Sequence, residues 1–265
     1  MSGSKNKLTK RKTLLYTTMG KLTPQTLPWV RRAFESWKKY NFDVVVFGEE
    51  EHEDLCKEYN INLDLKYEKN EFNLPLVKSL FLNAKRYDYD VYCYLNSDIE
   101  FQSSPQWIID GIEDDNFLLV GQRMNYDKDG KTSLHNPGGI DYFFYTKDFW
   151  EVEKDMPELA IACGRFDHYL LGYALKNGNG KVIDLTQGWT PLHPNYSREG
   201  DQSGNFHYLY SIGNLKRAYQ IYRNNIHYGR SRYHGQTDYT SYFLDEEGNI
   251  LQRFNKKKNE FDEIL

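Results

Sequence analysis

An uncharged run of apolar and aromatic residues, Val91–Leu95, is followed at once by Asn96, Ser97 and Asp98. A run of this kind is typical of a strand that is buried on both faces, as in a parallel sheet. Open α/β sheets bind their ligands at the carboxyl ends of such strands. The sequence therefore predicts an α/β fold with Asp98 at a ligand-binding edge, although an isolated Asp after a strand also commonly begins a turn.

Similar uncharged runs alternate with segments whose apolar residues recur every three to four positions, which is the spacing of an amphipathic helix. This alternation predicts right-handed β-α-β crossovers and a mostly parallel mixed sheet flanked by helices. The expected strands are Thr13–Thr18, Asp43–Phe47, 62–67, Val91–Leu95, 117–121, 140–145 and 182–185. The expected helices are 27–40, 52–59, 73–87, one that begins at Pro105, one within 163–177 and one at 214–222. Turn residues predict hairpins around 127–131 and within 239–254.

The length of 265 residues suits one large α/β domain, and the net charge of −4 excludes a generally basic nucleic-acid binder. The 22 tyrosines are many for this length, and tyrosine suits surfaces that bind polar ligands. Three cysteines, Cys56, Cys93 and Cys163, have no metal-type spacing and suit buried packing roles in a reducing compartment.

The sequence contains neither an apolar run of the roughly 18 residues that span a bilayer nor the apolar core of a secretory signal. Residues 1–12 form a basic tail that we expect to be disordered. This tail could contact an anionic membrane surface, but a solvated terminus is the interpretation we favour. We therefore expect a soluble cytoplasmic protein, peripheral to a membrane at most. We expect a single domain, with a core at 13–194 and a C-terminal extension at 195–265.

Three further positions are candidates for a site. Gly138 and Gly139 allow a backbone to approach a ligand closely, but they equally allow an ordinary tight turn. Asp167 begins an expected helix, where helix capping is its simplest role. His193 lies between two prolines that fix the backbone, although a lone loop histidine is more often a surface residue than a ligand.

The segments YLNSDIEF, GIDYFFY and GRFDHYLLGYAL, in this order and with these gaps, resemble the nucleotide-sugar-dependent glycosyltransferases of the GT-A fold. They are most similar to a poorly characterised group of these enzymes. The resemblance covers about residues 13–205, which is most of the chain. It implies a Rossmann-like sheet, a nucleoside-diphosphate sugar as donor and a glycan or glycoconjugate as acceptor.

The resemblance also implies roles for residues at the opening motif. Asn96, Ser97 and Asp98 match the position of the family's DxD motif, whose last Asp usually binds a divalent metal. Asp98 and His193 would then hold Mn²⁺ or Mg²⁺, with Mn²⁺ favoured. The chain departs from the motif at Asn96, which removes one negative charge and leaves open how strictly the enzyme depends on metal.

Other residues receive roles through the same resemblance. Asp167 would be the base that activates the acceptor hydroxyl, which favours an inverting reaction with a UDP-sugar as the preferred donor. The remaining donor contacts would come from Gly138, Gly139 and Lys78. Thr17 and Thr18 would contact the nucleotide, and Glu49 or Glu50 the base or ribose, although the acidic loop could equally be solvated. The tyrosine-rich segment 196–242 would form the acceptor side or simply cover the sheet.

Three alternatives remain open. A catalytically inactive member of the fold, which binds nucleotide-sugars or glycans, is favoured by Asn96. A metal-dependent phosphohydrolase would place its aspartates after the first strand, where this chain has Thr17 and Thr18. A sugar-nucleotide pyrophosphorylase, like a dinucleotide-binding domain, would need a glycine-rich loop at the same place, and the sequence has none there.

Overall fold

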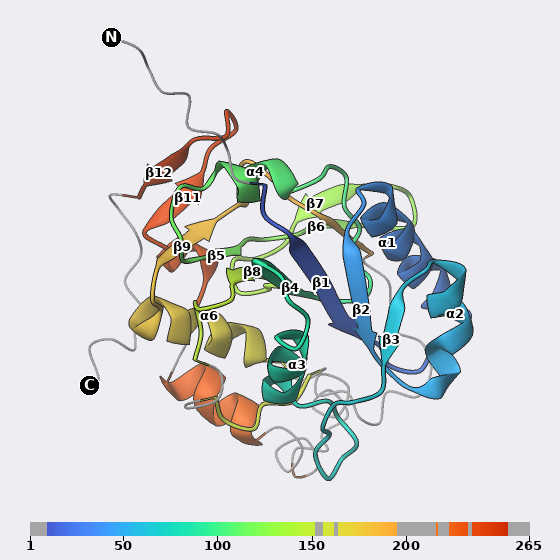
Figure 1. The fold of residues 1–265 in the computed structure, drawn as a ribbon. Coiled ribbons are helices and arrows are strands. Elements are labelled where there is room, and N and C mark those ends of the chain that lie inside the picture. The colour runs from blue at the N-terminus through green and yellow to red at the C-terminus, as the bar shows by residue number, and fades with distance from the viewer. Residues whose placement is uncertain are drawn as a thin grey trace.

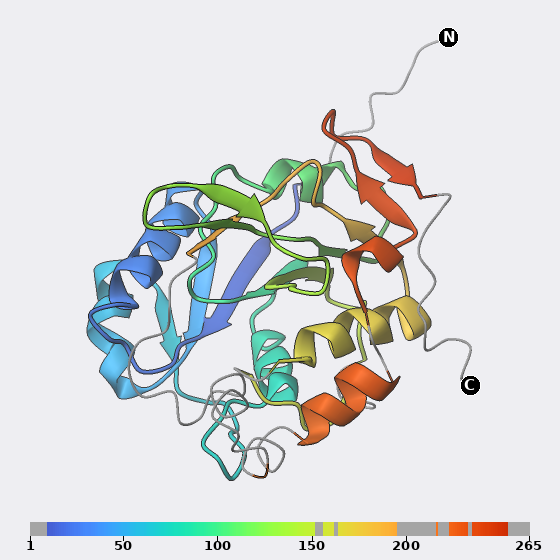
Figure 2. The ribbon, with the colours of Figure 1, turned by 180° about the vertical axis from the view of Figure 1, so that it is seen from behind.

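The computed structural model describes residues 10–151, 156–161, 164–194, 216, 223–232 and 235–253 of the chain. These residues form a nine-stranded sheet in the order β12-β11-β9-β5-β8-β4-β1-β2-β3 and a three-stranded sheet in the order β10-β6-β7. Figure 1 shows the large sheet with helices on either side of it. In Figure 2 the hairpin of the small sheet, coloured green, lies in front of the large one.

The strands of the large sheet are β1 (Thr13–Thr18), β2 (Asp43–Phe47), β3 (Asn62–Asp64), β4 (Val91–Leu95), β5 (Phe117–Val120), β8 (Tyr142–Thr146), β9 (Lys181–Asp184), β11 (Tyr242–Leu244) and β12 (Ile250–Gln252). Those of the small sheet are β6 (Met124–Tyr126), β7 (Thr132–Leu134) and β10 (Leu192–Pro194). The helices are α1 (Leu27–Lys39), α2 (Glu53–Glu58), α3 (Val77–Ala84), α4 (Gln106–Gly111) and α6 (Phe166–Asn177). Shorter helical segments are η1 (Glu50–His52), η2 (His227–Arg232) and η3 (Thr237–Tyr239).

Strand direction in the large sheet is mostly parallel. β8 runs antiparallel to its neighbours β4 and β5, and β12 runs antiparallel to β11, whereas the other pairs are parallel. Parallel strands are joined by crossovers that place helices on the sheet faces. The predicted fold class, a mixed and mostly parallel sheet flanked by helices, is confirmed.

Helices cover both faces of the sheet, which explains why its central strands carry no charge. In β4, Cys93 and Leu95 belong to the core that includes α1, α2 and α4. Their neighbours Tyr92 and Tyr94 belong to a second core that includes α3 and α6. Successive strand residues point to opposite faces, so a strand between two helix layers must be apolar throughout.

Most predicted strands and helices are present, and β1, β2 and β4 have the predicted bounds. The third strand is shorter than expected, because the Asp64 carboxylate accepts the amide of Lys66 at 2.8 Å and turns the chain. The helix predicted at 73–87 begins only at Val77. Before it, the Asn70 side chain accepts the amides of Phe72 and Leu74 in a turn.

The end of the basic tail is ordered, contrary to our expectation for residues 1–12. The guanidinium group of Arg11 donates to the carbonyls of Ile109 and Ile112, at 2.5 and 2.8 Å. The amide of Lys12 donates to the Asp90 carboxylate at 2.8 Å. Arg11 thus binds the C-terminal end of α4, where unpaired helix carbonyls favour a cation. The part of the tail before residue 10 lies outside the described residues.

The C-terminal part of the chain joins the large sheet. β11 and β12 form the predicted hairpin, and β11 pairs with β9. The other predicted hairpin is also confirmed, as β6 and β7 pair around the turn at Gly130, whose φ is +76°. Apart from Lys216, the helix expected at 214–222 lies outside the described residues, as does most of the tyrosine-rich segment.

Cys56 and Cys93 are buried free thiols, and burial raises the pKa of both, to about 11 for Cys56. Their predicted packing role is therefore confirmed, while Cys163 lies outside the described residues. Among the helices of the described ranges, none combines the length and the apolar character needed to cross a membrane.

Candidate active site

The carboxyl ends of β1, β2, β3 and β4 meet at one edge of the large sheet. Thr18 pairs with Phe47, and Phe47 pairs with Asp64, so β1, β2 and β3 end at the same level. Tyr16 pairs with Tyr94, which brings Asn96 to that level as well. The predicted edge is therefore formed, and it collects polar residues that are distant in the sequence.

Asp98 and His193 lie together at this edge. The Nε2 atom of His193 is 3.5 Å from Oδ2 of Asp98, and the two side chains are 14% and 16% exposed. His193 reaches this place because β10 pairs with β6, while Leu192 and Glu100 exchange backbone hydrogen bonds of 2.9 Å. Asp98 also lies in a turn, closed by the Ile99 amide on the Asn96 carbonyl at 3.2 Å. Asp98 therefore lies in a turn, as the simpler interpretation predicted, and beside His193 as well.

The pair of Asp98 and His193 matches what a shared metal ion requires, but it does not form a complete metal site. Among the described residues, no group of three or more His, Cys, Asp or Glu side chains could hold a metal ion. Mg²⁺ and similar ions are commonly held by one or two protein ligands together with substrate phosphates. A carboxylate and an imidazole at this distance fit an ion that a diphosphate also binds.

Asn96 is held by its neighbours in the sheet. Its Nδ2 donates to Oδ1 of Asp141 at 2.6 Å, and its Oδ1 accepts the Tyr94 hydroxyl at 3.3 Å. Its backbone amide donates to the Asp141 carbonyl at 3.0 Å. Asn96 therefore connects β4 to the start of β8, and both ends of its amide are already engaged. This engagement makes a direct role in metal binding unfavourable.

Asp141 and Arg123 were not recognised from the sequence. Asp141 is 8% exposed, and its second oxygen, Oδ2, forms an ion pair with Arg123. Arg123 also donates from Nε to Oδ1 of Asn125 at 3.0 Å. Asp141 stands at the start of the apolar run of β8, where a charged residue among aromatic ones is unusual. That contrast is the only sequence signal that could have identified it.

Asp167 lies in the first turn of α6, as predicted. Its Oδ1 atom is buried and has no hydrogen-bond partner in the described part of the chain. Burial raises the pKa of this carboxyl group to about 6, although the backbone amides of His168 and Ile140 and the charge of Arg165 act in the opposite direction. Arg165, directly before the helix, has a φ of +83°, which side-chain-bearing residues rarely adopt.

Tyr94 connects the two carboxylates. Its side chain is 1% exposed, so burial raises the pKa of its hydroxyl, and the charges of Asp98 and Asp167 raise it further. Both carboxylates therefore act on the same phenol, which lies on the face of β4 that packs against α6. The arrangement brings a partly exposed carboxylate and a buried one, with a raised pKa, to one place.

The two glycines that we expected to contact a ligand lie close to histidine rings. A Cβ atom added to Gly139 would overlap the ring of His135, and one added to Gly138 would lie 2.9 Å from Cε1 of His168. Glycine at both positions therefore allows the histidine rings to lie close to the backbone. Burial and, as the smaller cause, the charge of Arg123 together lower the pKa of His135 to about 4.

Glu49 lines a separate open pocket of about 510 Å³ beyond the ends of β2 and β3, together with Gly48, Glu50, Glu51, Leu65, Lys69 and Asn73. Hydrogen bonds from Lys69 and from Tyr67 lower the pKa of the Glu49 carboxyl group. Glu49 is therefore ionised and paired, so the expected acidic loop is only partly solvated.

The remaining predicted residues differ in how well they could contact a ligand. Thr17 is fully buried, and its hydroxyl donates to the Thr18 carbonyl at 3.4 Å, so this side chain does not face a ligand. The Thr18 hydroxyl oxygen is buried without a hydrogen-bond partner among the described residues. Lys78 lies in the first turn of α3, and Ser97 follows Asn96 in the turn. Both are partly exposed.

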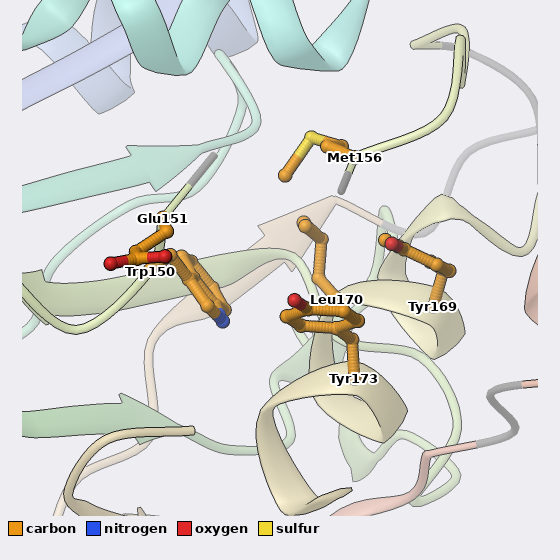
Figure 3. A pocket seen from close by; sticks show the side chains of 6 residues that line it. All are labelled: Trp150, Glu151, Met156, Tyr169, Leu170 and Tyr173. Atoms are coloured by element: carbon orange, nitrogen blue, oxygen red, sulfur yellow. The ribbon is translucent and has the colours of Figure 1, made fainter. Parts of the chain in front are cut away.

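A second, smaller pocket does not belong to this edge. Figure 3 shows the side chains that line it, Trp150, Glu151, Met156, Tyr169, Leu170 and Tyr173. None of the predicted site residues lines this pocket, and Glu151 is its only charged residue. We therefore assign the candidate active site to the edge that holds Asp98, His193 and Asp167.

No protein-family model and no curated protein sequence matches the chain. Among solved structures, it is similar to the mannosyltransferase PcManGT from Pyrobaculum calidifontis in complex with GDP-Man and Mn²⁺, with a TM-score of 0.49 and 7% identity. That match covers 80% of this chain and 64% of the other, so the chain spans somewhat less than two thirds of the mannosyltransferase. It is also similar to S. aureus TarS 1–349 in complex with UDP-GlcNAc, with a TM-score of 0.47, 13% identity and coverage of 82% and 75%. Both of these structures contain a nucleotide-sugar, and similarity at this level assigns neither a function nor a residue role to this chain.

Proposed function

We propose that this protein is a glycosyltransferase that moves a sugar from a nucleoside-diphosphate sugar to an acceptor hydroxyl on a glycan or glycoconjugate. One observation carries the proposal. Asp98 and His193 lie 3.5 Å apart at the carboxyl edge of a parallel sheet, and the buried carboxylate of Asp167 lies close to the same tyrosine as Asp98. A diphosphate bound at Asp98 and His193 would then lie near a base at Asp167.

The donor would bind with its diphosphate at Asp98 and His193. A Mn²⁺ or Mg²⁺ ion held by these two residues would neutralise the charge that develops on the leaving diphosphate. Thr18 and Ser97, at the same edge, would contact the nucleotide. The pocket that Glu49 and Lys69 line lies beyond the neighbouring strands, and its size suits a base or ribose. We favour a UDP-sugar as donor.

The acceptor hydroxyl would lose its proton to Asp167. Its oxygen then bonds to the anomeric carbon, while the bond from that carbon to the diphosphate breaks and the diphosphate takes the electron pair. A base that acts from the face opposite the leaving group produces inversion. With a pKa of about 6, Asp167 is mostly ionised at neutral pH and is still basic enough to accept a proton.

The alternative is a protein that binds nucleotide-sugars or glycans without transferring them. The observation that favours it is Asn96, whose amide is engaged with Asp141 and Tyr94 instead of facing a metal ion. The two functions differ in the fate of the donor, because a binding protein leaves it intact.

A donor panel separates these functions. Purified protein is incubated with UDP-, GDP- and dTDP-sugars and Mn²⁺, and the released nucleoside diphosphate is measured. We expect slow release from one class of donor and none with Asp167→Asn, since a positioned base contributes about 10²- to 10⁴-fold. Binding of a nucleotide-sugar without release from any donor would support the binding protein and contradict the transferase.

A further inference from the structure

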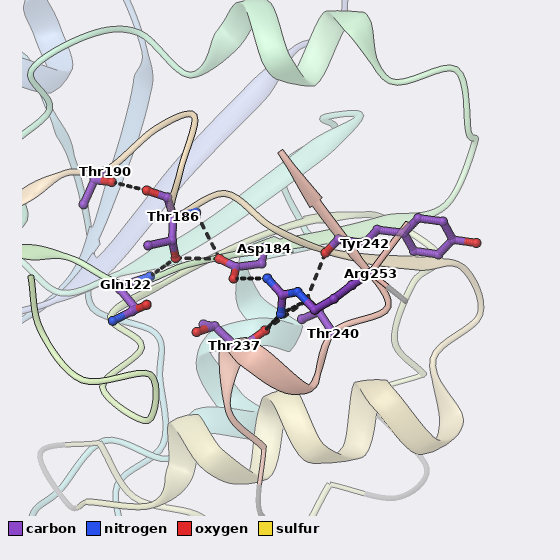
Figure 4. A network of polar contacts seen from close by, with 8 residues as sticks. All are labelled: Gln122, Asp184, Thr186, Thr190, Thr237, Thr240, Tyr242 and Arg253. Atoms are coloured by element: carbon purple, nitrogen blue, oxygen red, sulfur yellow. Dashed lines mark hydrogen bonds and ion pairs between the residues drawn. The ribbon is translucent and has the colours of Figure 1, made fainter. Parts of the chain in front are cut away.

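An ion pair at the C-terminal end of the described chain is linked to the candidate active site. The guanidinium group of Arg253 donates from Nη2 to Oδ2 of Asp184 at 2.9 Å (Figure 4). Asp184 ends β9, Arg253 directly follows β12, and their side chains are 7% and 20% exposed. The guanidinium also lies 5.4 Å from the ring centroid of Phe243. The pair is therefore largely removed from water, where charge-assisted hydrogen bonds hold their geometry well.

One arm of hydrogen bonds runs from Arg253 to the loop before β8. Nη1 of Arg253 donates to the carbonyl of Thr237 at 2.9 Å and to Oγ1 of Thr240 at 3.2 Å. The amide of Thr237 in turn donates to the carbonyl of Pro137 at 3.1 Å. Arg253 thus fixes Thr237, and Thr237 in turn holds the loop at Pro137, one position before Gly138.

A second arm runs from Asp184 to the same loop. Oδ1 of Asp184 accepts both the amide and the hydroxyl of Thr186, at 2.9 and 2.5 Å. The Thr186 hydroxyl accepts the amide of Gln122 at 2.9 Å, and the Gln122 side chain donates to the carbonyl of His135. The loop is therefore held at two of its carbonyls, and both arms meet at the Asp184–Arg253 pair (Figure 4).

The residues after this loop carry the candidate catalytic contacts. The amide of Ile140 contacts the Asp167 carboxylate, and Asp141 holds Asn96 at 2.6 Å. The segment that Arg253 fixes also reaches α6, because the amide of Gly235 donates to the carbonyl of His168 at 3.0 Å. A shift of the segment around Thr237 would therefore move both the loop that precedes Ile140 and the first turn of α6, which together surround the Asp167 carboxylate.

We infer that Arg253 is a positioning residue: through its pair with Asp184 it sets the loop 135–139, and thereby the orientation of Asp167 and Asn96, without contacting substrate. The inference rests on the proposed function. It predicts that loss of the Arg253 guanidinium slows the transfer step and leaves donor binding intact, because the two arms described above lead to the loop 135–139 and to α6, whereas the donor would bind at Asp98 and His193.

The test compares Arg253→Met with Lys181→Met. Lys181 begins β9 and pairs with Asp114 at 2.8 Å, and its ammonium lies 5.2 Å from the ring centroid of Tyr242. It therefore offers a matched ion pair on the same strand, at the edge away from the site. We expect Arg253→Met to lower kcat by about 10²-fold with an unchanged Kd for the donor, while Lys181→Met leaves kcat unchanged. Equal values of kcat in the two variants at equal thermal stability would overturn the inference.

A second variant and a second readout keep the test decisive. Gln122→Met breaks the other arm while the Asp184–Arg253 pair stays intact, and we expect the same loss of kcat without a loss of donor binding. Amide exchange of residues 138–141 is measured as well, and it should become faster in Arg253→Met and in Gln122→Met but not in Lys181→Met. If the wild-type protein transfers no sugar, the proposed function is wrong, and unchanged exchange in these two variants would separately show that the network does not hold the loop.

Discussion

At the scale of single residues, Asp167 connects chemistry and stability. Burial raises the pKa of its carboxyl group from 3.8 to about 6, so the folded protein holds this proton more tightly than the unfolded chain does. The stability contribution of this group is therefore greatest below pH 4 and falls as the pH rises through 6. At neutral pH the ionised carboxylate costs the fold energy, as is common for catalytic groups.

This cost gives a prediction for Asp167→Asn. The amide carries no charge and can still accept the Ile140 amide, so we expect the variant to be more stable than the wild type by about 1–3 kcal/mol at pH 7.5. The gain should shrink as the pH is lowered toward 4. Urea unfolding of both proteins at the two pH values measures it. A variant that is less stable at pH 7.5 would show that the carboxylate serves as a cap for α6 rather than as a strained catalytic group.

Asn96 gives a second prediction at this scale. In Asn96→Asp, two carboxylates would face each other across the contact that now measures 2.6 Å between Asn96 and Asp141. We expect a loss of about 1–3 kcal/mol in the free energy of unfolding at neutral pH. Restoring a DxD pattern at this position should therefore lower the stability of the protein.

The double variant Asn96→Asp with Asp141→Asn is the control. There the hydrogen bond can form again with donor and acceptor exchanged, and the amide oxygen introduced by Asp141→Asn can still accept from Arg123. We expect urea unfolding to show most of the lost stability returning. If the single variant is as stable as the wild type, the Asn96–Asp141 contact does not determine the residue type at position 96.

The sequence was informative about residues at strand ends and much less so about their partners. Asp98 and Asp167 were chosen as candidates because each stands close to the end of a predicted strand or the start of a predicted helix, and His193 because two prolines flank it. Asp141 and Arg123 could not be found, because their contact with Asn96 depends on β8 lying antiparallel beside β4. Thr17 was assigned to the nucleotide because it is near a strand end, but its side chain is fully buried, since both faces of β1 are covered.

At the scale of secondary-structure elements, charge-free runs predicted the central strands well because helices cover both faces of the sheet. Pairing order was less accessible, since no local signal states that β8 inserts between β4 and β5. The β11–β12 hairpin was predicted from its turn residues, but its parallel pairing with β9 was not. Elements of three residues, such as β10, have too short a pattern to be recognised from their sequence.

The loop between β7 and β8 gives a prediction of its own. A Cβ atom at Gly139 would overlap the ring of His135. Hydrogen bonds hold this ring on both sides, because the side-chain nitrogen of Asn125 lies 3.2 Å from Nδ1 of His135 and that of Asn136 lies 3.2 Å from Nε2. We expect Gly139→Ala to lower the free energy of unfolding by about 1–3 kcal/mol, because overpacking forces the ring to move. Thermal unfolding measures this change.

Two controls accompany the Gly139 variant. Gly111, at the end of α4, has no atom within 4 Å of an added Cβ, so Gly111→Ala should be neutral or slightly stabilising. Combining Gly139→Ala with His135→Ala removes the overlap and should recover part of the loss. A Gly139→Ala protein as stable as Gly111→Ala would contradict the close packing of the His135 ring.

At the scale of the whole molecule, the site depends on segments from most of the described chain. The turn after β4 supplies Asp98, β10 supplies His193 and α6 supplies Asp167, while β8 and the C-terminal hairpin hold the loop between them. Such long-range assembly is why the fold class could be predicted from local patterns but the contacts of the site could not. It also explains why residues as distant in sequence as Arg253 can influence the proposed chemistry.

The central claim is that the edge around Asp98 binds a nucleoside diphosphate. Calorimetric titration of UDP and of GDP, each with Mn²⁺, into the wild type, Asp98→Ala and Asp88→Ala tests it most directly. Asp88 is a matched control, because its side chain is 98% exposed and precedes β4 at the opposite edge of the sheet. We predict that one nucleotide binds the wild type and Asp88→Ala equally, and Asp98→Ala at least about tenfold more weakly, which corresponds to about 1.4 kcal/mol. Equal binding to all three proteins, or binding of neither nucleotide to the wild type, would contradict the claim.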